Sequence, residues 1–594
     1  MIPGKGIPEM NYDNYAVYGI NGPVVTVKGP SPFAMQEMVY VGKNRLVGEV
    51  ISVNSEYTTI QVYEDTVGLK PGEPVSGSGA PMSLELSPGL MSNIFDGIGR
   101  PLNDMYSSQG AFINVGYSDT ENNKKWKVNI KVSVGDEVKQ GQIFATLPET
   151  PVIEYRCLVP YGVNGKITHT VQDGEYTKND VLAYVESNGK KIPLKMSQRW
   201  PIRTPRPSLE KIPPFIPLIT GQRVIDALFP VAKGGTAAIP GGFGSGKTMT
   251  QHQLAKWCDA DIIVYVGCGE RGNEMCQVLD EFSHLTDPKT NRPMTDRTVL
   301  IANTSNMPVA AREASIYTGV TIAEFYRDMG YHVAMMADST SRWAEALREI
   351  SGRLEEMPAE EGFPAYLPSR LSDFYERAAY VKTLGGYSGS VTLIGAVSPQ
   401  GADFSEPVTQ NTKRFTRCFW ALDKSLAYQR HYPAINWMQS YSEYFSDLDK
   451  WYDDNAGHDF IIYRKEITAL LNEEDGLIEI VRLIGADVLP DEQKLIIEIA
   501  RIIRVGFLQQ NAFHAEDTYV PLEKQKLMMK TILYLYEKAS SLVSQAVPIS
   551  DIVSTGLFEK ITAIKYDVEN DRLDKFDAYI KEIDEKLSGF GRDI

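Results

Sequence analysis

The sequence predicts a multidomain protein with an N-terminal β-barrel, an inserted β-rich module, a central α/β domain and a C-terminal α-helical domain. Three observations support this prediction. The chain of 594 residues is too long for a single hydrophobic core. Up to Lys195, short apolar runs alternate with glycine, proline and asparagine, which is typical of strands and tight turns. Beyond Thr220 strands alternate with helical segments, and after Asp447 the strand pattern disappears.

The composition is that of a soluble globular enzyme. Apolar residues make up 43% and charged residues 23% of the chain, so long disordered regions are not expected. The formal net charge of −16 argues against a large nucleic-acid-binding face. Residues 1–13 lack the basic and apolar regions of a secretory signal, and no apolar run is long enough to cross a bilayer. We expect a soluble chain that stays in the cytoplasm and binds no nucleic acid.

The cysteines indicate neither a disulfide framework nor a zinc site. There are five of them, an odd number, and none forms a CxxC pair. We expect all of them to be buried free thiols, namely Cys157, Cys258, Cys268, Cys276 and Cys418.

The first 83 residues predict a flexible extension followed by a small barrel. Residues 1–14 are rich in proline and glycine, and we assign them no role. Residues 15–83 contain apolar runs at 22–27, 49–53 and 58–63, each bounded by turn residues. These runs are too few for a sandwich of ordinary size. A closed barrel is the economical arrangement, because closure leaves no exposed strand edge.

Residues 84–115 are expected to form a connector, with a short helix and a turn between Leu84 and Leu102. Residues 116–197 then form the inserted β-rich module. Its GDxVxxG spacing at 135–141 is followed by two more glycine turns, and this pattern resembles the folded-over sandwich of lipoyl and biotinyl domains. No lysine stands in the acceptor turn of those domains, so we interpret the module as a contact surface and not as a carrier of a covalent cofactor.

Residues 198–440 are expected to form the α/β domain, and a proline-rich run at 203–217 marks a rigid boundary before its alternating strands and helices. A helix from Val309 to Met329 is expected to connect parallel strands. The candidate buried strands are four apolar runs, at 262–267, 299–302, 333–337 and 391–397. In the helical domain, residues 441–594, apolar residues recur at helical spacing after Asp491, an expected N-cap, and after Pro521.

The strongest motif is the glycine-rich run from Gly241 to Thr248. It follows an apolar segment at 236–240 and leads into a helix predicted from Met249 to Lys256, which is the context of a phosphate-binding loop. Backbone N–H groups and the positive end of the helix dipole would face the phosphates. Lys247 would reach the β- and γ-phosphates, and Thr248 would hold Mg²⁺. The candidate nucleotide-binding residues are Gly241, Gly242, Phe243, Gly244, Ser245, Gly246, Lys247, Thr248 and Met249.

Hydrolysis needs a carboxylate for the metal and a group that orients water. Asp338 ends the apolar strand 333–337, so its carboxylate would lie at the strand's carboxyl edge and bind the Mg²⁺ hydration shell. It could also cap the helix that follows, and the two roles are compatible. Glu270 follows the strand 262–266 and is the candidate that polarises water. Arg271 and Arg342 are candidates for stabilising charge on the transferred phosphate, but structural ion pairing remains an equal alternative.

Together with the phosphate-binding loop, several long motifs resemble the catalytic A subunit of V-type and archaeal A-type rotary ATPases. The resemblance extends from the barrel to the C-terminus. It includes the inserted module, which catalytic subunits of F-type ATP synthases lack. The remaining motifs are the runs 220–223, 269–274, 302–308, 336–343 and 433–442.

The resemblance implies that 198–440 is a RecA-like P-loop nucleotide-binding domain that uses ATP/ADP and Mg²⁺. It implies that Glu270 activates water and that Arg271 and Arg342 lie near the γ-phosphate. Tyr432 and Phe513 match positions of the aromatic adenine pocket, although either residue could be core by sequence alone. The implied complex is a ring of three A and three B subunits that lies at the cytoplasmic face of a membrane. A B-subunit arginine would complete each site.

The same resemblance implies a central stalk of D and F subunits, a peripheral stalk of E and G subunits, and a membrane sector. The C-terminal helices would push on the rotor, and ATP hydrolysis or synthesis would be coupled to proton or sodium transport. Two departures stand out. Gly242 occupies a usual proline position, and Ser245 replaces the cysteine of eukaryotic vacuolar members, which suggests a prokaryotic enzyme. The alternatives are a non-catalytic nucleotide-binding ring component, an assembly scaffold, or another hexameric RecA-like motor such as a secretion ATPase or the Rho helicase.

Overall fold

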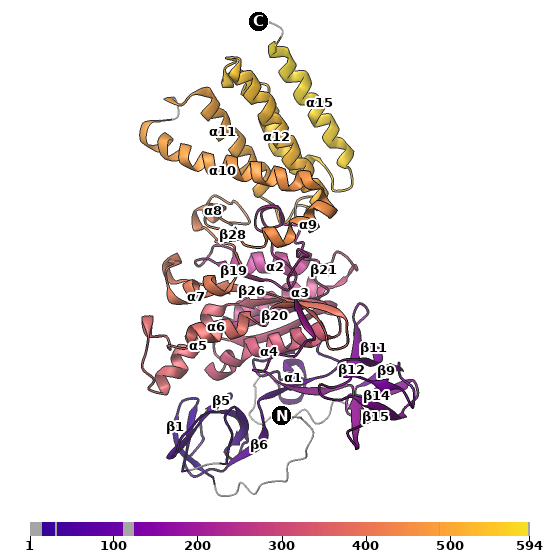
Figure 1. The fold of residues 1–594 in the computed structure, drawn as a ribbon. Helices are drawn as coiled ribbons and strands as arrows, with labels where there is room; N and C mark the ends of the chain where they lie inside the picture. Colours follow the sequence, from indigo (N-terminus) through magenta and orange to yellow (C-terminus); the bar gives the residue numbers. More distant parts are fainter. Residues whose placement is uncertain (1–14, 30–31, 111–123, 486–487, 592–594) are drawn as a thin grey trace.

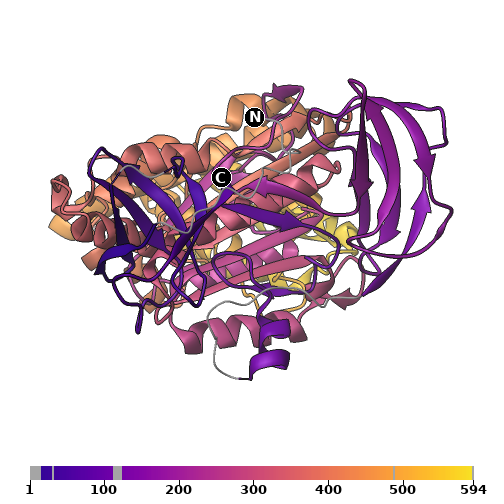
Figure 2. The same cartoon turned by 90° about the horizontal axis from the view of Figure 1, so that it is seen from below.

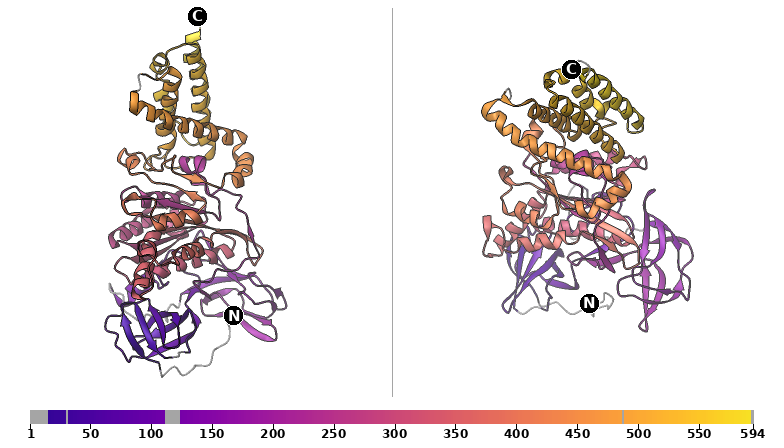
Figure 3. Two further views of the ribbon diagram at one scale, coloured as in Figure 1. Left: turned by 60° about the vertical axis from the view of Figure 1, so that its left-hand side comes forward. Right: turned by 45° about the horizontal axis from the view of Figure 1, so that its top comes forward.

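The computed structural model describes residues 15–29, 32–110, 124–485 and 488–591. The extension assigned to residues 1–14 lies outside these ranges. The molecule is elongated, with the β-barrel at one end, the α/β domain in the middle and the C-terminal helices at the other end (Figure 1). Two further views show the same separation of the barrel from the helices (Figure 3). In the described part of the chain, no helix combines the length and the apolar character that a membrane span needs.

The N-terminal strands form the predicted barrel. Six strands pair in the order β1-β2-β5-β4-β3-β6. An isolated bridge between Ala16 and Pro74 joins the two end strands and closes the barrel. Its core consists of fully buried β-branched residues such as Val25, Val39 and Ile60. The strands are β1 (Val17–Asn21), β2 (Val24–Lys28), β3 (Glu37–Val41), β4 (Leu46–Val53), β5 (Tyr57–Val62) and β6 (Val75–Pro81).

The connector differs from the prediction, because no helix forms between Leu84 and Leu102. Strand β7 (Ser83–Leu86) pairs antiparallel with β17 (Gln198–Pro201), so the chain leaving the barrel runs beside the chain returning from the inserted module. Strand β8 (Ile94–Phe95) pairs with the edge of the central sheet, and helix α1 (Leu102–Gln109) comes only afterwards. Alternating burial along β7 and the glycines that follow it favour extended backbone over a helix.

The inserted module is a sandwich of two four-stranded sheets, ordered β12-β11-β9-β14 and β10-β13-β15-β16. Phe144, Tyr155 and Val185 are fully buried in it. Figure 2 shows the module and the barrel on opposite sides of the molecule. The strands are β9 (Lys125–Ile130), β10 (Glu137–Val138), β11 (Ile143–Pro148), β12 (Glu154–Leu158), β13 (Gly165–Thr170), β14 (Gly174–Thr177), β15 (Val181–Ser187) and β16 (Lys190–Lys195).

The central sheet confirms the four predicted parallel strands and extends each of them. Together with β19 they lie in the order β19-β26-β24-β20-β23, with all neighbours parallel. Ile263 and Tyr265 of β20 pack on one face of the sheet, whereas Val264 and Val266 pack on the other, because strand side chains alternate. The strands are β19 (Thr236–Pro240), β20 (Ile262–Glu270), β23 (Thr298–Thr304), β24 (His332–Asp338) and β26 (Ser388–Val397).

Helices cover both faces of this sheet, so the strands are apolar along nearly their whole length. Helix α4 (Val309–Asp328) has the predicted position and is buried along nearly all of its length. A largely buried arginine connects this helix to the barrel, since Arg203 lies 2.9 Å from Glu49 of β4 and 2.7 Å from Glu313 of α4. The other helices of the domain are α2 (Lys247–Trp257), α3 (Gly272–His284), α5 (Thr340–Arg353), α6 (Leu367–Tyr375), α7 (Pro407–Phe415) and α8 (Lys424–Tyr428).

The C-terminal domain is helical, as predicted, and shares a continuous core with the central sheet. Asp491 is not an N-cap, because Pro490 holds that position and Asp491 begins the helix itself. Its carboxylate instead accepts a hydrogen bond from the backbone N–H of Ile549 at 3.2 Å. The helices are α9 (Phe445–Ala456), α10 (His458–Ile484), α11 (Asp491–Ile502), α12 (Leu522–Ser544), α13 (Ile549–Ser554), α14 (Leu557–Asp567) and α15 (Phe576–Leu587).

The cysteines are free thiols, but the prediction that all of them are buried is wrong. Cys276 is exposed on α3, whereas the other four are buried. Met275 and Val278 of α3 face the core. Cys276, the residue after Met275, lies on the opposite face of the helix, toward solvent.

Candidate nucleotide site

The glycine-rich run connects β19 to α2 and forms a compact loop. Gly244 and Gly246 have positive φ angles of 77° and 91°, which favour glycine. The Ser245 hydroxyl donates to the Gly242 carbonyl at 2.8 Å and closes the turn. Lys247 is the first residue of α2, and its ammonium group donates to the carbonyls of Gly241 and Gly242 at 2.7 and 3.0 Å. The Lys247 ammonium group therefore lies over the loop, where phosphates would be bound.

Asp338 ends β24 beside the loop, and its side chain is almost completely buried. The Thr248 hydroxyl donates to its Oδ2 atom at 3.0 Å, and the Tyr265 hydroxyl donates to the same atom at 3.2 Å. Burial raises the pKa of Asp338, and the hydrogen bond from Thr248 opposes that shift. The additional capping role is wrong: Ser339 is the N-cap residue of α5, because β24 extends through Asp338. The Thr248 hydroxyl and the Asp338 carboxylate, which the sequence predicted as Mg²⁺ ligands, therefore lie within hydrogen-bond distance of each other.

Glu270 ends β20, the strand next to β24. Gly267 is the register partner of Asp338, so both acids lie at the same carboxyl edge of the sheet. Burial raises the pKa of Glu270 to about 8, and the neighbouring charges of Asp338 and Glu274 contribute to the rise. The phosphate-binding loop and the two carboxylates are thus placed together at one edge, as the sequence predicted.

Each candidate arginine is paired with a carboxylate one helical turn away. Arg271 is the N-cap residue of α3 and lies 3.7 Å from Glu274. Its guanidinium group also lies 5.8 Å from the centre of the exposed Phe243 ring. Arg342 on α5 lies 2.9 Å from Glu345. Exposed pairs of this kind contribute little stability, so both guanidinium groups can exchange these partners for a phosphate without a large energetic cost.

The two candidate aromatic residues are exposed, so neither is a core residue. Tyr432 is 44% exposed and Phe513 is 90% exposed. The Tyr432 ring lies against the loop, since a Cβ atom built at Gly246 would be 3.6 Å from its Cε1 atom. The Gln510 N–H donates to the Tyr432 carbonyl at 2.7 Å, which joins the segment containing Phe513 to the backbone of Tyr432. Met249, on the first turn of α2, is also exposed.

Sequence reasoning missed three residues that border the loop. Tyr265 donates to Asp338, and the buried Gln251 amide donates to the Ala337 carbonyl at 3.4 Å. Lys424 of α8 fills the space beside Gly242, where an added Cβ atom would lie 2.4 Å from its Cε atom. The alternation of β20 could have indicated that Tyr265 points toward α2. No sequence signal connects Lys424 to a loop so distant along the chain.

Four family models match the chain, and together they cover most of it. Residues 17–79 match the beta-barrel domain of the ATP synthase alpha/beta family, and residues 118–203 match the alpha/beta subunit barrel-sandwich domain. Residues 221–442 match the nucleotide-binding domain of the same family. Residues 449–553 match the C-terminal domain of V and A type ATP synthase.

Full-length relatives have closely similar sequences. The V-type ATP synthase alpha chain of Halothermothrix orenii is 58% identical over 570 residues, covering 95% of this chain and 97% of the relative. The V-type ATP synthase alpha chain 2 of Clostridium tetani is 57% identical over 580 residues, covering 97% of both chains. The A subunit of the A-type ATP synthase of Methanopyrus kandleri is 55% identical over 573 residues, covering 96% of this chain and 97% of the relative.

A solved structure, the assembled ATPase EscN of the enteropathogenic E. coli type III secretion system, has a TM-score of 0.63. It is 20% identical and covers 88% of this chain and 100% of its own, so the likeness supports the RecA-like fold alone. The secretion-ATPase alternative is therefore not favoured over relatives that match nearly the whole chain at more than half identity. The chain belongs to the family of V-type and A-type ATP synthase alpha chains, also called A subunits, which are the catalytic subunits of rotary ATPases.

Proposed function

We propose that this chain binds and hydrolyses ATP at the edge of its central sheet, and synthesises ATP when the coupled ion gradient reverses the reaction. The observation that supports this most strongly is the combination of Lys247, Asp338 and Glu270 at one edge of the sheet. A subunit that only holds nucleotide needs the loop and the lysine. It has no need for a second carboxylate at the end of the neighbouring strand.

The phosphate groups would be held by the loop backbone and by Lys247, whose charge balances that of the β- and γ-phosphates. Thr248 and Asp338 fit a Mg²⁺ ion, because a hydroxyl and a carboxylate are oxygen ligands and Mg²⁺ takes few ligands from the protein. When bound, Mg²⁺ would neutralise charge on the phosphate oxygens.

Glu270 would accept a hydrogen bond from the attacking water and orient it toward the γ-phosphate. Its place at the end of β20, next to Asp338, is consistent with that role. Arg271 and Arg342 would leave their exposed carboxylate partners and stabilise charge on the transferred phosphate. Tyr432 and Phe513 would hold the adenine base. The Tyr432 ring lies exposed beside the loop, and Phe513 presents an exposed ring on a segment that is hydrogen-bonded to the Tyr432 backbone.

The partners that we propose are those of the family. The B subunit would alternate with this chain in a six-membered ring and supply a further arginine to the site. The D and F subunits would form the rotor, and the E and G subunits would form the peripheral stalk. The ring would lie at the cytoplasmic face of a membrane and couple ATP turnover to proton or sodium transport in a membrane sector.

The test is steady-state ATP hydrolysis by this chain assembled with its B partner, together with nucleotide binding. Glu270→Gln should reduce turnover by a factor on the order of 100 or more, while ATP affinity persists. Asp280→Asn, a change at an exposed acid of the helix that follows Glu270, is the matched control and should leave turnover unchanged. Unchanged turnover in Glu270→Gln would reassign the chain as a nucleotide-holding component of the ring.

A further inference from the structure

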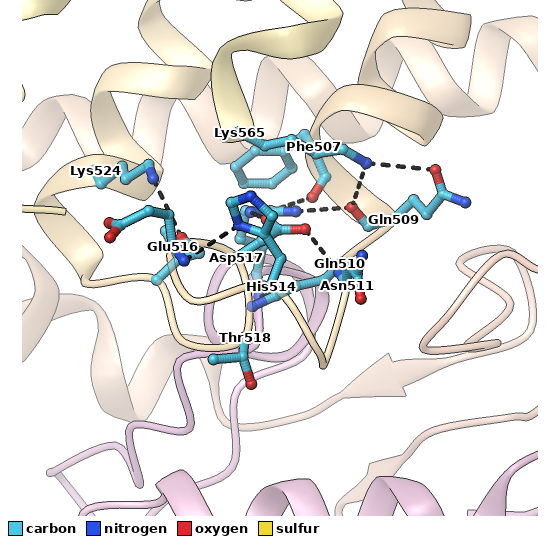
Figure 4. Close-up of polar contacts among 12 residues, drawn as sticks. Phe507, Gln509, Gln510, Asn511, His514, Glu516, Asp517, Thr518, Lys524 and Lys565 are labelled. Atoms are coloured by element: carbon cyan, nitrogen blue, oxygen red, sulfur yellow. Dashed lines mark hydrogen bonds and ion pairs between the residues drawn. The ribbon is translucent and has the colours of Figure 1, made fainter. Parts of the chain in front are cut away.

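The segment 509–520 joins the π-helix 503–508 to α12 and contains Phe513. Its polar side chains gather beneath the C-terminal helices (Figure 4). The Phe513 ring is almost fully exposed, so side-chain packing does not fix its position. The position of this ring must therefore be set by whatever holds the backbone of the segment.

Arg223 holds that backbone from the central domain. The side chains of Arg223 and its partner Asp517 are both fully buried, and the Arg223 Nη1 atom lies 2.5 Å from the Asp517 carboxylate. The Nη2 atom donates to the Gln509 carbonyl at 2.7 Å, and Nε donates to the Phe507 carbonyl. The backbone N–H of Arg223 donates to the Gln510 side chain at 2.9 Å. One residue thus contacts the segment at several points.

The contacts continue from this ion pair to both aromatic residues. The second oxygen of Asp517 accepts from the Asn511 N–H at 2.7 Å, and the Asn511 side chain accepts from the Phe513 N–H at 3.0 Å. Gln510 donates its side-chain amide to the Gly221 carbonyl at 2.8 Å and its backbone N–H to the Tyr432 carbonyl at 2.7 Å. Arg223, Asp517 and Gln510, which we call the clamp, therefore hold the backbones that present Phe513 and Tyr432.

The segment also contacts the helix that begins at the phosphate-binding loop. Trp257, the last residue of α2, donates to the Thr518 hydroxyl at 3.1 Å. Its ring stacks on Tyr519 with 5.2 Å between the ring centres. Helix α2 therefore has the phosphate cradle at its N-terminus and the 509–520 segment at its C-terminus, which fixes the spacing between the two.

Stability alone does not explain a fully buried ion pair in this place. Desolvation of both charges offsets much of their attraction, and apolar residues of similar volume are often as stable or more stable. What the pair supplies is geometry, because the planar guanidinium group directs several hydrogen bonds at fixed angles. A fixed backbone geometry would increase ligand affinity at this segment, because a binding site that is ordered before the ligand arrives loses less entropy on binding.

We propose that Arg223 and Asp517 are positioning residues for the adenine base: their buried ion pair holds the 509–520 segment so that Phe513 stays beside Tyr432, without either residue touching the nucleotide. This inference rests on the proposed aromatic base pocket. It requires that loss of the pair weakens binding through the base and leaves binding through the phosphates unchanged.

The experiment measures equilibrium binding of ATP and of inorganic tripolyphosphate to the full chain, with Mg²⁺ present. The double variant Arg223→Met/Asp517→Leu replaces the pair by apolar groups, and Gln510→Met removes two hydrogen bonds while both charges stay paired. Each should raise the Kd for ATP by about tenfold and change the Kd for tripolyphosphate less than about twofold. Glu498→Gln, which breaks an exposed ion pair on α11, is the control and should change neither.

Equal weakening of both ligands, or no weakening of ATP binding, would overturn the positioning role. Phe513→Ala separates this inference from the pocket on which it rests. If Phe513→Ala weakens ATP binding but the clamp variants do not, only the positioning role fails. If Phe513→Ala leaves ATP affinity unchanged, the aromatic pocket itself fails, and the inference fails with it. In the assembled complex, the clamp variants should raise KM for ATP and leave kcat at saturating ATP unchanged.

Discussion

The proposed phosphate side of the site, at the loop 241–248, and the proposed base side, at Tyr432 and Phe513, are built in different ways. The phosphate cradle is made of consecutive residues between β19 and α2, and Lys247 contacts carbonyls only five and six positions away. The base side is assembled from distant segments, and the Arg223–Asp517 contact spans 294 positions. A local loop depends on glycine geometry and on the strand and helix that flank it. A distant contact depends on the folding of the C-terminal domain onto the central one.

The largest expected effect is on the stability of the base side. Asp517→Leu leaves the Arg223 charge buried without a partner, which should cost roughly 3–5 kcal/mol of unfolding free energy. The double variant Arg223→Met/Asp517→Leu should recover most of that loss, because no charge remains buried. Urea unfolding of the three proteins measures the difference. Equal stability of Asp517→Leu and the parent protein would contradict the clamp.

The phosphate side should show the opposite behaviour. Lys247→Ala removes a charge-assisted contact and should weaken ATP binding on the order of 100-fold, about 3 kcal/mol, with little effect on stability. Tripolyphosphate binding should weaken to a similar extent. Lys256→Ala, at the other end of α2, serves as the control in the same titration calorimetry experiment. Retention of ATP affinity within about threefold would contradict the assignment of Lys247.

A smaller effect is expected for the metal site. Asp338→Asn should weaken ATP binding about tenfold in Mg²⁺ and leave binding unchanged when Mg²⁺ is chelated. Tyr265→Phe removes only a hydrogen bond to Asp338 and should give a loss of about threefold, again only with Mg²⁺. A loss of equal size in both conditions would show that Asp338 supports the loop and not the metal.

The base side should also show a pH-dependent stability. Lys565 donates to the carbonyls of Val505 and Gln509 at 2.7 and 3.1 Å, and burial lowers its pKa to about 8. Burial of the charged lysine therefore lowers the free energy of unfolding, and the full loss applies below pH 8, where Lys565 is charged in both the folded and the unfolded protein. It is relieved between pH 8 and the unfolded value near 10.4, so stability should rise over that window. Thermal melts of Lys565→Met should lack this component of the rise.

Much of the fold was predictable because the central strands are long apolar runs. Such runs, for example 262–267 and 333–337, need only burial on both faces to form a parallel sheet. The connector was not predictable in the same way. Leu84 and Leu86 form a strand because β17 lies beside them, and β17 follows only after the whole inserted module. Its pairing is a tertiary contact.

The sequence by itself determined the proposed phosphate side of the site, since the loop, Lys247, Asp338 and Glu270 each follow directly from a strand or lead into a helix. Local backbone geometry and strand direction are enough to place them at one edge of the sheet. The tertiary structure alone decided the exposure of Tyr432 and Phe513, the contacts of Tyr265 and Lys424, and the buried partner of Arg223. These depend on which distant segments are packed together, and packing between distant segments leaves no periodic signal in either of them.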